Sequence, residues 1–276
     1  MIFHHVSDFT DAYSNGIHIA RGDRWPEAWV KSAADYRQTM QSAGRARLGQ
    51  SYGPGERHRY DLFLPIGAPR GLVVFIHGGY WMSLDNSYWS HFAQGAVQHG
   101  YAVAMPSYDL CPQVRIAGIV RQIGAAITAA ATEVPGPIAI TGHSAGGHLT
   151  ARMLSEGTPL PAEVIARVSI CLPISGLFDL RPLMQSRLNE TLQIDEAEAL
   201  AESPALLRPV KPVRMMAWVG GGEREEFRRQ NALLANVWTG LGARTAAWAE
   251  PDRHHFDVLD GLADPAHPMV RLLTAD

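Results

Sequence analysis

The stretch from residue 138 to residue 149 constrains the fold of this chain more than any other. Residues 138–141 form a short apolar, β-branched run, which predicts a buried strand. The turn Gly-His-Ser-Ala-Gly at 142–146 follows at once, and a helical spacing of apolar residues begins at Leu149. Gly-x-Ser-x-Gly between a strand and a helix is typical of a nucleophile elbow, which presents the hydroxyl of Ser144 at the end of a parallel strand.

Strands and helices alternate along the rest of the chain. Apolar runs predict further strands at residues 58–65, 71–76, 101–105, 168–172, 213–219 and 244–248. Helical spacing predicts helices at residues 26–40, 88–99, 116–132 and 227–241, and helical turns at 256–262 and 269–273. Residues 44–55 are polar and glycine-rich, so we expect a loop there. The alternation predicts an α/β fold with a mostly parallel central sheet and helices on both faces.

No change in composition divides the chain, so we expect a single domain over residues 1–276. Residues 1–57 lack a strong strand pattern, and their helix either caps the active site or packs on the outer layer of the sheet. Residues 175–209 carry mixed helical signals, and we expect them to connect the core elements rather than to form a separate domain.

Composition narrows the range of partners. The formal net charge is -3 and no basic stripe occurs, so neither nucleic acid nor an anionic membrane is expected to bind. No apolar run approaches the roughly 18 residues that span a bilayer. Cys111 and Cys171 lie in apolar contexts, which favours free buried thiols, and with no visible signal peptide a cytoplasmic location is expected. The partner is expected to be a small-molecule substrate, with a homodimer as an open alternative to a monomer.

A serine hydroxyl becomes a nucleophile only when a base takes its proton and a carboxylate orients that base. On sheets of this kind the three residues follow the order serine, acid, histidine. Glu223 fits the acid position, because it follows the predicted strand at 213–219 on a glycine-rich turn. Asp179, after an earlier strand, is the second candidate. Glu225 and Glu226 are expected to be solvated carboxylates in the first turn of the next helix.

The histidine that completes the order must lie after the last predicted strand. Asp-Arg-His-His-Phe-Asp at 252–257 supplies two candidates, His254 and His255, and spacing alone does not separate them. His143 lies within the elbow and is expected to pack or bond beside it, and His148 lies on the helix after the serine and is expected to point elsewhere.

The segment His-Gly-Gly at 77–79 resembles the loops whose backbone N–H groups bind an oxyanion after the third strand. We expect the N–H groups of Gly78, Gly79 and Ala145 to form that site, the last at a helix N-terminus. Four aromatic residues lie on loops at the same edge of the sheet and are candidates for a substrate pocket: Tyr80, Trp81, Tyr108 and Phe178.

No cofactor is expected. The 12 histidines show no His-Glu-x-x-His or Cys/His ligand spacing, so no catalytic metal is predicted. Neither a Gly-x-Gly-x-x-Gly motif nor a phosphate-binding loop occurs.

Five segments together resemble the arylformamidases, which are kynurenine formamidases of the α/β-hydrolase fold within the hormone-sensitive-lipase-like esterases. They are His-Gly-Gly-Tyr-Trp (77–81), Tyr-Asp-Leu-Cys-Pro (108–112), Gly-His-Ser-Ala-Gly-Gly-His-Leu (142–149), Gly-Gly-Gly-Glu-x-x-Glu-Phe-x-x-Gln (220–230) and His-His-Phe-Asp (254–257). The resemblance runs from about Tyr60 to Leu262. It implies a triad of Ser144, Glu223 and His255, because the family histidine directly precedes Phe-Asp. The family usually has aspartate at the acid position, so glutamate here is a departure.

The resemblance implies a serine hydrolase, and we expect it to convert N-formylkynurenine to kynurenine and formate, a step of tryptophan catabolism. A general short-chain carboxylesterase is the alternative. A non-catalytic binding protein of the same fold is a third hypothesis, and the intact order of Ser144, Glu223 and His255 argues against it.

Overall fold

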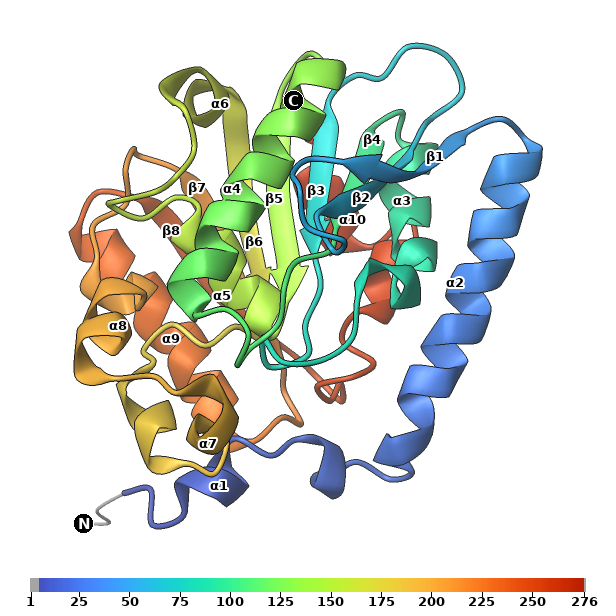
Figure 1. Cartoon of the computed structure of the whole chain (residues 1–276). Helices are drawn as coiled ribbons and strands as arrows, with labels where there is room; N and C mark the ends of the chain where they lie inside the picture. The colour runs from blue at the N-terminus through green and yellow to red at the C-terminus, as the bar shows by residue number, and fades with distance from the viewer. Residues whose placement is uncertain (1–4, 276) are drawn as a thin grey trace.

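The computed structural model describes residues 5–275 and is built on one eight-stranded sheet (Figure 1). The strands lie in the order β1-β2-β4-β3-β5-β6-β7-β8. Their bounds are β1 Ala46–Ser51, β2 Arg59–Phe63, β3 Leu72–Ile76, β4 Ala102–Pro106, β5 Ile138–His143, β6 Val168–Ile174, β7 Arg214–Gly220 and β8 Arg244–Glu250. The sheet confirms the predicted α/β fold.

Pairing is antiparallel at one side of the sheet and parallel over the rest. β1 pairs with β2 and β2 with β4 in antiparallel register, whereas every pair from β4 through β3, β5, β6 and β7 to β8 is parallel. Every residue of β3, β4 and β5 is buried, as expected for strands covered on both faces. Because parallel strands share a direction, the carboxyl ends of β3, β5, β6 and β7 meet at one edge.

Helices cover both faces, and each face has its own hydrophobic cluster. One face carries α4 (Ile116–Glu133), α5 (Ala145–Arg152) and α9 (Glu225–Gly240). The other carries α2 (Trp25–Ser42), α3 (Gln94–Gln98) and α10 (Pro268–Leu273). The remaining helices are short: α1 Phe9–Ala12, α6 Ala162–Arg167, α7 Asn189–Leu192 and α8 Glu196–Ala201. No helix in the described part of the chain is both long enough and apolar enough to cross a membrane.

Two sequence predictions were wrong in detail. Residues 46–51 form the edge strand β1 rather than a loop. Only every second residue of β1 is partly buried, and Gly49 lies at a register irregularity with φ +66°. Because these residues are polar or glycine, the sequence there did not indicate a strand. Of residues 88–99, only Gln94–Gln98 is α-helical, because the chain before it forms two 3-10 turns, Asn86–Tyr88 and Ser90–Ala93.

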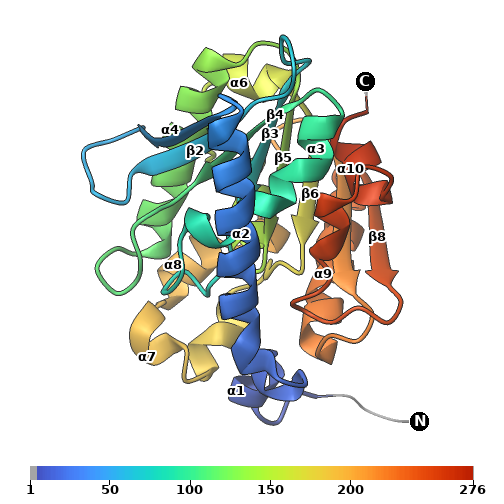
Figure 2. The ribbon, with the colours of Figure 1, turned by 90° about the vertical axis from the view of Figure 1, so that its right-hand side faces the viewer.

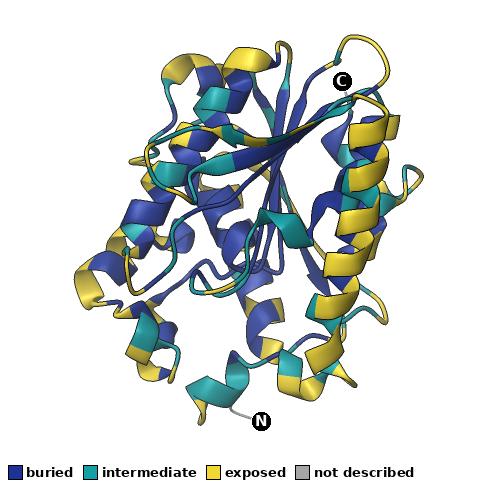
Figure 3. Cartoon of the chain, turned by 45° about the vertical axis from the view of Figure 1, so that its right-hand side comes forward, coloured by how far each residue is buried: buried dark blue, intermediate teal, exposed yellow. Residues whose placement is uncertain are grey.

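The N-terminal segment passes across the carboxyl edge of the sheet before α2 begins (Figures 1 and 2). It comprises α1 and two 3-10 turns, Gly16–His18 and Gly22–Arg24. α2 then runs along the outside of the second face, where Trp29, Ala33 and Met40 are buried and the other helix residues are partly or fully exposed (Figure 3).

Candidate active site

Ser144 lies between β5 and α5 in a strained backbone conformation, with φ 57° and ψ -117°. Such a conformation is rare for a residue with a Cβ and persists only where its surroundings hold it. The surroundings here are tight: a Cβ on Gly146 would lie 1.9 Å from the carbonyl oxygen of Ile76. The predicted elbow is therefore present, with Ser144 at the N-terminus of α5.

Glu223 and His255 form a buried hydrogen-bonded pair at the carboxyl edge of the sheet. Nδ1 of His255 lies 2.6 Å from Oε2 of Glu223, and the two side chains are 4 % and 0 % exposed. Since a carboxylate only accepts, Nδ1–H is the donor, and Nε2 of a neutral ring is left free to accept a proton. The ring of His255 lies 4.5 Å from that of His143, the residue before Ser144. The structure thus gathers the three predicted triad positions at one edge.

The second oxygen of Glu223 is held by two donors. The backbone N–H of Gly220 lies 2.8 Å from Oε1, and the hydroxyl of Ser175 donates to the same oxygen. Ser175 follows β6 directly, with φ 51° and no exposed surface. The sequence did not predict the contact of Ser175 with Glu223. Ser175 follows a predicted strand, but serine is too common in such positions to indicate a functional residue.

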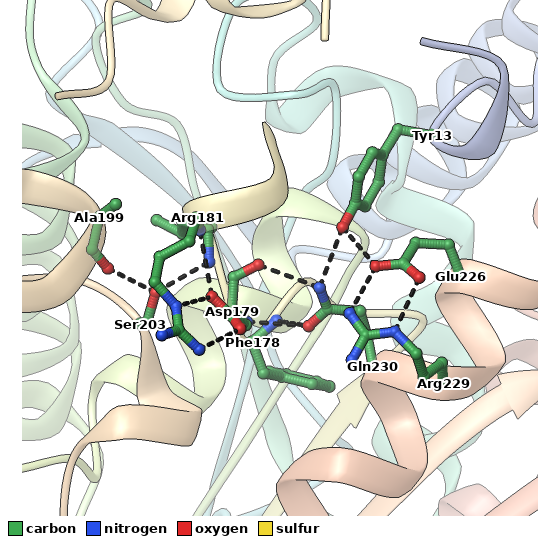
Figure 4. Close-up of polar contacts among 10 residues, drawn as sticks. Tyr13, Phe178, Asp179, Arg181, Ala199, Ser203, Glu226, Arg229 and Gln230 are labelled. Atoms are coloured by element: carbon green, nitrogen blue, oxygen red, sulfur yellow. Dashed lines mark hydrogen bonds and ion pairs between the residues drawn. The ribbon is translucent and has the colours of Figure 1, made fainter. Parts of the chain in front are cut away.

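The alternative residues have other partners. Asp179 forms a two-pronged ion pair with Arg181, at 3.0 and 2.8 Å. The side chain of Glu225 is 89 % exposed, as predicted. Glu226 is buried instead, which corrects the expectation that it is solvated. Its burial is compensated by a two-pronged ion pair with Arg229 and a hydrogen bond from the hydroxyl of Tyr13 (Figure 4).

The neighbouring His254 points away from this pair. Its ring packs edge-on against Trp25 of α2 at 5.2 Å, and its backbone N–H donates to Asp257. The structure therefore separates the two histidines that spacing left open, since His255 alone of the two contacts Glu223.

The glycine loop after β3 passes directly beside the elbow. A Cβ on Gly78 would lie 3.1 Å from the Cβ of Ser144, so the backbone of this loop approaches the nucleophile closely. Gly79 has φ +115°, and a Cβ there would meet the carbonyl oxygen of Ser83 at 2.2 Å. Ala145, the residue after Ser144, is the first residue of α5. The two backbone segments that carry the predicted oxyanion donors thus adjoin Ser144.

The four predicted pocket aromatics divide into two kinds. Tyr80 lines a cavity of about 520 Å³ together with residues of the N-terminal segment and Leu188. Trp81, Tyr108 and Phe178 are fully buried in the core. Tyr108 stacks on His77 with ring centroids 4.2 Å apart, and Trp81 packs edge-on against His148. These three residues therefore pack behind the site and do not line that cavity.

The N-terminal segment lies over the Glu223–His255 pair. A Cβ on Gly16 would be 3.5 Å from the ring of Phe256, the residue after the histidine. The hydroxyl of Tyr80 donates to the carbonyl of Tyr13. Tyr13 is itself fixed, because its hydroxyl donates to Glu226 at 2.6 Å and accepts from Gln230 at 3.1 Å (Figure 4).

Other buried histidines near the elbow are held neutral. Burial lowers the pKa of His77 to about 4 and that of His148 to about 3. Burial and the neighbouring His255 hold the pKa of His143 well below its usual range, and neither ring nitrogen of His143 has a hydrogen-bond partner within residues 5–275. Within the same residues, no three His, Cys, Asp or Glu side chains converge as a metal site requires.

Comparison with known proteins agrees with this geometry. The BD-FAE family model matches residues 60–199. Kynurenine formamidase from Drosophila melanogaster is 34 % identical, and the match covers 73 % of this chain and 71 % of the relative. Kynurenine formamidase from Salmo salar is 27 % identical, and the match covers 94 % of this chain and 92 % of the relative. The crystal structure of a "putative thioesterase" from Silicibacter sp. TM1040 superposes with a TM-score of 0.92 at 48 % identity, covering 97 % of this chain and 99 % of the other. The chain therefore belongs to the BD-FAE family and to the family of the kynurenine formamidases, and it is a serine hydrolase of the α/β-hydrolase fold.

Proposed function

We propose that this enzyme is an arylformamidase that hydrolyses N-formylkynurenine to kynurenine and formate, with Ser144, Glu223 and His255 as its catalytic triad. The observation that carries the proposal is the buried 2.6 Å hydrogen bond between His255 and Glu223 at the edge where the elbow presents Ser144. The relatives named kynurenine formamidase support the choice of substrate.

In the proposed reaction, Nε2 of His255 takes the proton of the Ser144 hydroxyl as Oγ attacks the formyl carbon. The N–H groups of Gly78, Gly79 and Ala145 stabilise the oxyanion that forms. Collapse of this intermediate breaks the carbon–nitrogen bond, and His255 gives its proton to the departing arylamine. His255 then deprotonates a water, which attacks the formyl carbon. The ester bond breaks, Oγ of Ser144 takes the proton back from His255, and formate leaves.

Glu223 has two tasks, and both recur in each half of this cycle. It accepts the Nδ1–H bond of His255, which fixes the tautomer that leaves Nε2 free, and its charge stabilises the imidazolium that forms. Because Glu223 is buried, water does not screen this interaction.

The substrate is proposed to enter beside Tyr80, in the cavity of about 520 Å³ that the N-terminal segment also lines. Trp81, Tyr108 and Phe178 are fully buried, so we assign them to packing and not to contact with the substrate. We propose that residues 5–24 form the cap and that α2 belongs to the outer layer of the single domain.

A second candidate is a short-chain carboxylesterase or thioesterase, which the 48 % identical structure named as a thioesterase favours. The same triad cleaves esters and thioesters, so the discrimination lies in the acyl and leaving groups. Steady-state rates with N-formylkynurenine, p-nitrophenyl acetate, p-nitrophenyl butyrate and acetyl-coenzyme A separate the candidates. Turnover of esters or thioesters without turnover of N-formylkynurenine would reject the arylformamidase.

Labelling by a fluorophosphonate tests the mechanism separately from the substrate. The wild-type enzyme is expected to react and Ser144→Ala is not, because the probe traps the activated hydroxyl. Labelling that survives in Ser144→Ala would remove Ser144 from its proposed role. A cytoplasmic location is proposed from the free, buried state of both cysteines. The homodimer stays a prediction from the sequence.

A further inference from the structure

The cavity beside Tyr80 is bounded by three segments that are far apart in the sequence. The N-terminal segment supplies most of its wall, Tyr80 follows the glycine loop, and Leu188 lies where α7 begins (Figure 1). Asn15 also lines the cavity, and its Oδ1 lies 3.5 Å from the backbone N–H donor of Arg224, the residue after Glu223. The cavity therefore adjoins the turn that carries the proposed catalytic acid.

Most of the residues in the wall of this cavity are apolar or aromatic. Ile17, Ile19 and Leu188 are aliphatic, and Tyr13 and Tyr80 are aromatic. Ile17 is 77 % exposed, so an apolar side chain is open to a ligand there. Ligand sites typically combine such a wall with a few polar groups that fix the orientation of the ligand. An aryl group is the kind of ligand body that this wall accepts.

Two opposite charges complete the wall. Among the described residues that line the cavity, only Arg21 and Asp23 are charged. Both are exposed, and neither side chain forms a hydrogen bond or an ion pair within residues 5–275. The two side chains therefore neutralise neither each other nor another group, and each is available to a ligand charge of opposite sign.

The backbone of the turn holds Arg21 and Asp23 on either side of Gly22. Arg21 has φ 54° and ψ 36°, a left-handed conformation that is uncommon for a residue with a Cβ. A Cβ on Gly22 would lie 2.2 Å from the carbonyl oxygen of Gly16, so the turn packs main chain against main chain. The N–H of Gly22 also donates to the carbonyl of Ile19 at 2.9 Å. The backbone that carries the two charges is thus ordered before a ligand binds, which lowers the cost of binding.

An α-amino acid carries the matching pair of charges on one carbon. A guanidinium binds a carboxylate through two parallel N–H bonds, and a carboxylate accepts hydrogen bonds from an ammonium. N-formylkynurenine has such an amino-acid head, joined by a short chain to an aryl ring that carries the formamide. p-Nitrophenyl esters have the aryl ring without the head. The cavity thus offers what N-formylkynurenine requires, which is an apolar wall, a cation and an anion.

From these observations we infer that Arg21 binds the α-carboxylate of the substrate and Asp23 its α-ammonium, so that the cavity selects formanilides with an α-amino-acid head. The inference rests on the proposed function and deepens it, because it assigns the part of the substrate that does not react. Contacts away from the reacting carbonyl help to hold that carbonyl at Ser144. Arg21 and Asp23 bind the head and take no part in bond breaking.

Two analogues of N-formylkynurenine isolate the two charges. N-formylkynuramine lacks the carboxylate, and the deaminated analogue, a formamidophenyl-oxobutanoate, lacks the ammonium. The wild type is expected to hydrolyse each analogue with a kcat/KM about tenfold below that for N-formylkynurenine, because each lacks one charged hydrogen-bonding group. Arg21→Gln is expected to lose the preference over N-formylkynuramine, and Asp23→Asn the preference over the deaminated analogue.

Arg24→Gln and Glu27→Gln are the matched controls. Both residues are exposed and lie close to the turn in sequence, but neither is among the described residues that line the cavity. Each control removes one charge of the same sign as its test variant. Both controls are expected to keep both preferences, so a loss in the test variants alone is not an effect of net charge.

The outcomes separate this inference from the proposed function. Turnover of N-formylkynurenine with no preference over the analogues, or a preference that survives its own substitution, would overturn the inference and leave the proposed function standing. Absence of N-formylkynurenine turnover in the wild type would instead reject the proposed function.

Binding of kynurenine tests the head site without turnover, because this product keeps both charges. Calorimetric titration of Ser144→Ala with kynurenine is expected to show binding. Adding Arg21→Gln or Asp23→Asn to Ser144→Ala is expected to raise the dissociation constant about tenfold. Equal binding by all three proteins, or no binding by any of them, would contradict the assignment of the two charges.

Discussion

Ser175 donates its hydroxyl hydrogen bond to Oε1 of Glu223, while His255 occupies Oε2 of the same carboxylate. Together with the N–H of Gly220, Ser175 fixes a carboxylate that has one more methylene than the aspartate usual in this family. A longer side chain has more rotamers, so a second anchor restores the orientation that the imidazole needs. The serine thereby becomes a positioning residue for the acid.

Ser175→Ala is expected to lower kcat about tenfold and to leave KM nearly unchanged, because a hydrogen bond to a charged group contributes about 1.5–3 kcal/mol. The measurement is steady-state hydrolysis of p-nitrophenyl acetate. Ser169→Ala in β6, the strand that precedes Ser175, is the control, since the hydroxyl of Ser169 bonds only a backbone carbonyl. An equal loss in both variants would mean that the effect is structural.

Glu223→Gln is expected to lower kcat by about 10³–10⁴, because an amide can present its N–H to Nδ1 and favour the wrong tautomer. Asp179→Asn should instead keep kcat within a few-fold, because Asp179 pairs with Arg181 and not with a histidine. The comparison uses purified variants at equal folded concentration. The larger loss in Asp179→Asn would reassign the catalytic acid.

Ser144→Gly and Ser144→Ala should both be inactive but should differ in stability. Glycine adopts φ 57° and ψ -117° without the Cβ strain that alanine keeps, so Ser144→Gly is expected to be more stable by about 1 kcal/mol. Thermal unfolding followed by circular dichroism measures the difference. A lower melting temperature for Ser144→Gly than for Ser144→Ala would show that the backbone of the elbow is not strained.

Acid should destabilise the fold partly through His148. Its folded pKa, lowered by burial to about 3, lies below the unfolded value of about 6.5, so the unfolded chain binds the proton first as pH falls. The stability that His148 contributes is thus complete above about pH 6.5 and is lost as pH falls toward 3, with about 2 kcal/mol lost at pH 5.

His148→Gln removes this titration and retains a donor for the carbonyl of Glu202. Its free energy of unfolding is expected to fall less between pH 7 and pH 5 than that of the wild type, as measured by urea titration at each pH. Parallel losses in the two proteins would assign the acid sensitivity to other groups.

Tyr13→Phe should loosen the N-terminal segment, because it deprives buried Glu226 and Gln230 of a partner. We expect a loss of about 1–3 kcal/mol in unfolding free energy and faster hydrogen exchange over residues 9–22. Tyr36→Phe is the matched control, since the Tyr36 hydroxyl has no hydrogen-bond partner among the described residues. Unchanged exchange in Tyr13→Phe would show that other contacts hold the segment.

The sequence predicted those elements that have a clear run or spacing of apolar residues, or a characteristic turn motif. The buried runs of β3 and β5 and the Gly-x-Ser-x-Gly turn depend on neighbouring residues alone, so they could be recognised from the chain. Ser175, Glu226 and Tyr13 could not, because their roles depend on partners 48 and 213 residues away. The burial of Trp81 and Phe178 could not be predicted for the same reason, because the residues that cover an aromatic side chain on a loop are distant in the sequence.

The backbone of α5 abuts the end of β3 at Gly146, where even a methyl group would collide with the carbonyls of Ile76 and His77. The spacing between the nucleophile and the glycine loop is thus set by main chain against main chain. Side chains that line the entrance can change without disturbing that spacing. Descendants of such a scaffold can acquire new substrates by substitution at the rim while the acyl-transfer machinery stays the same.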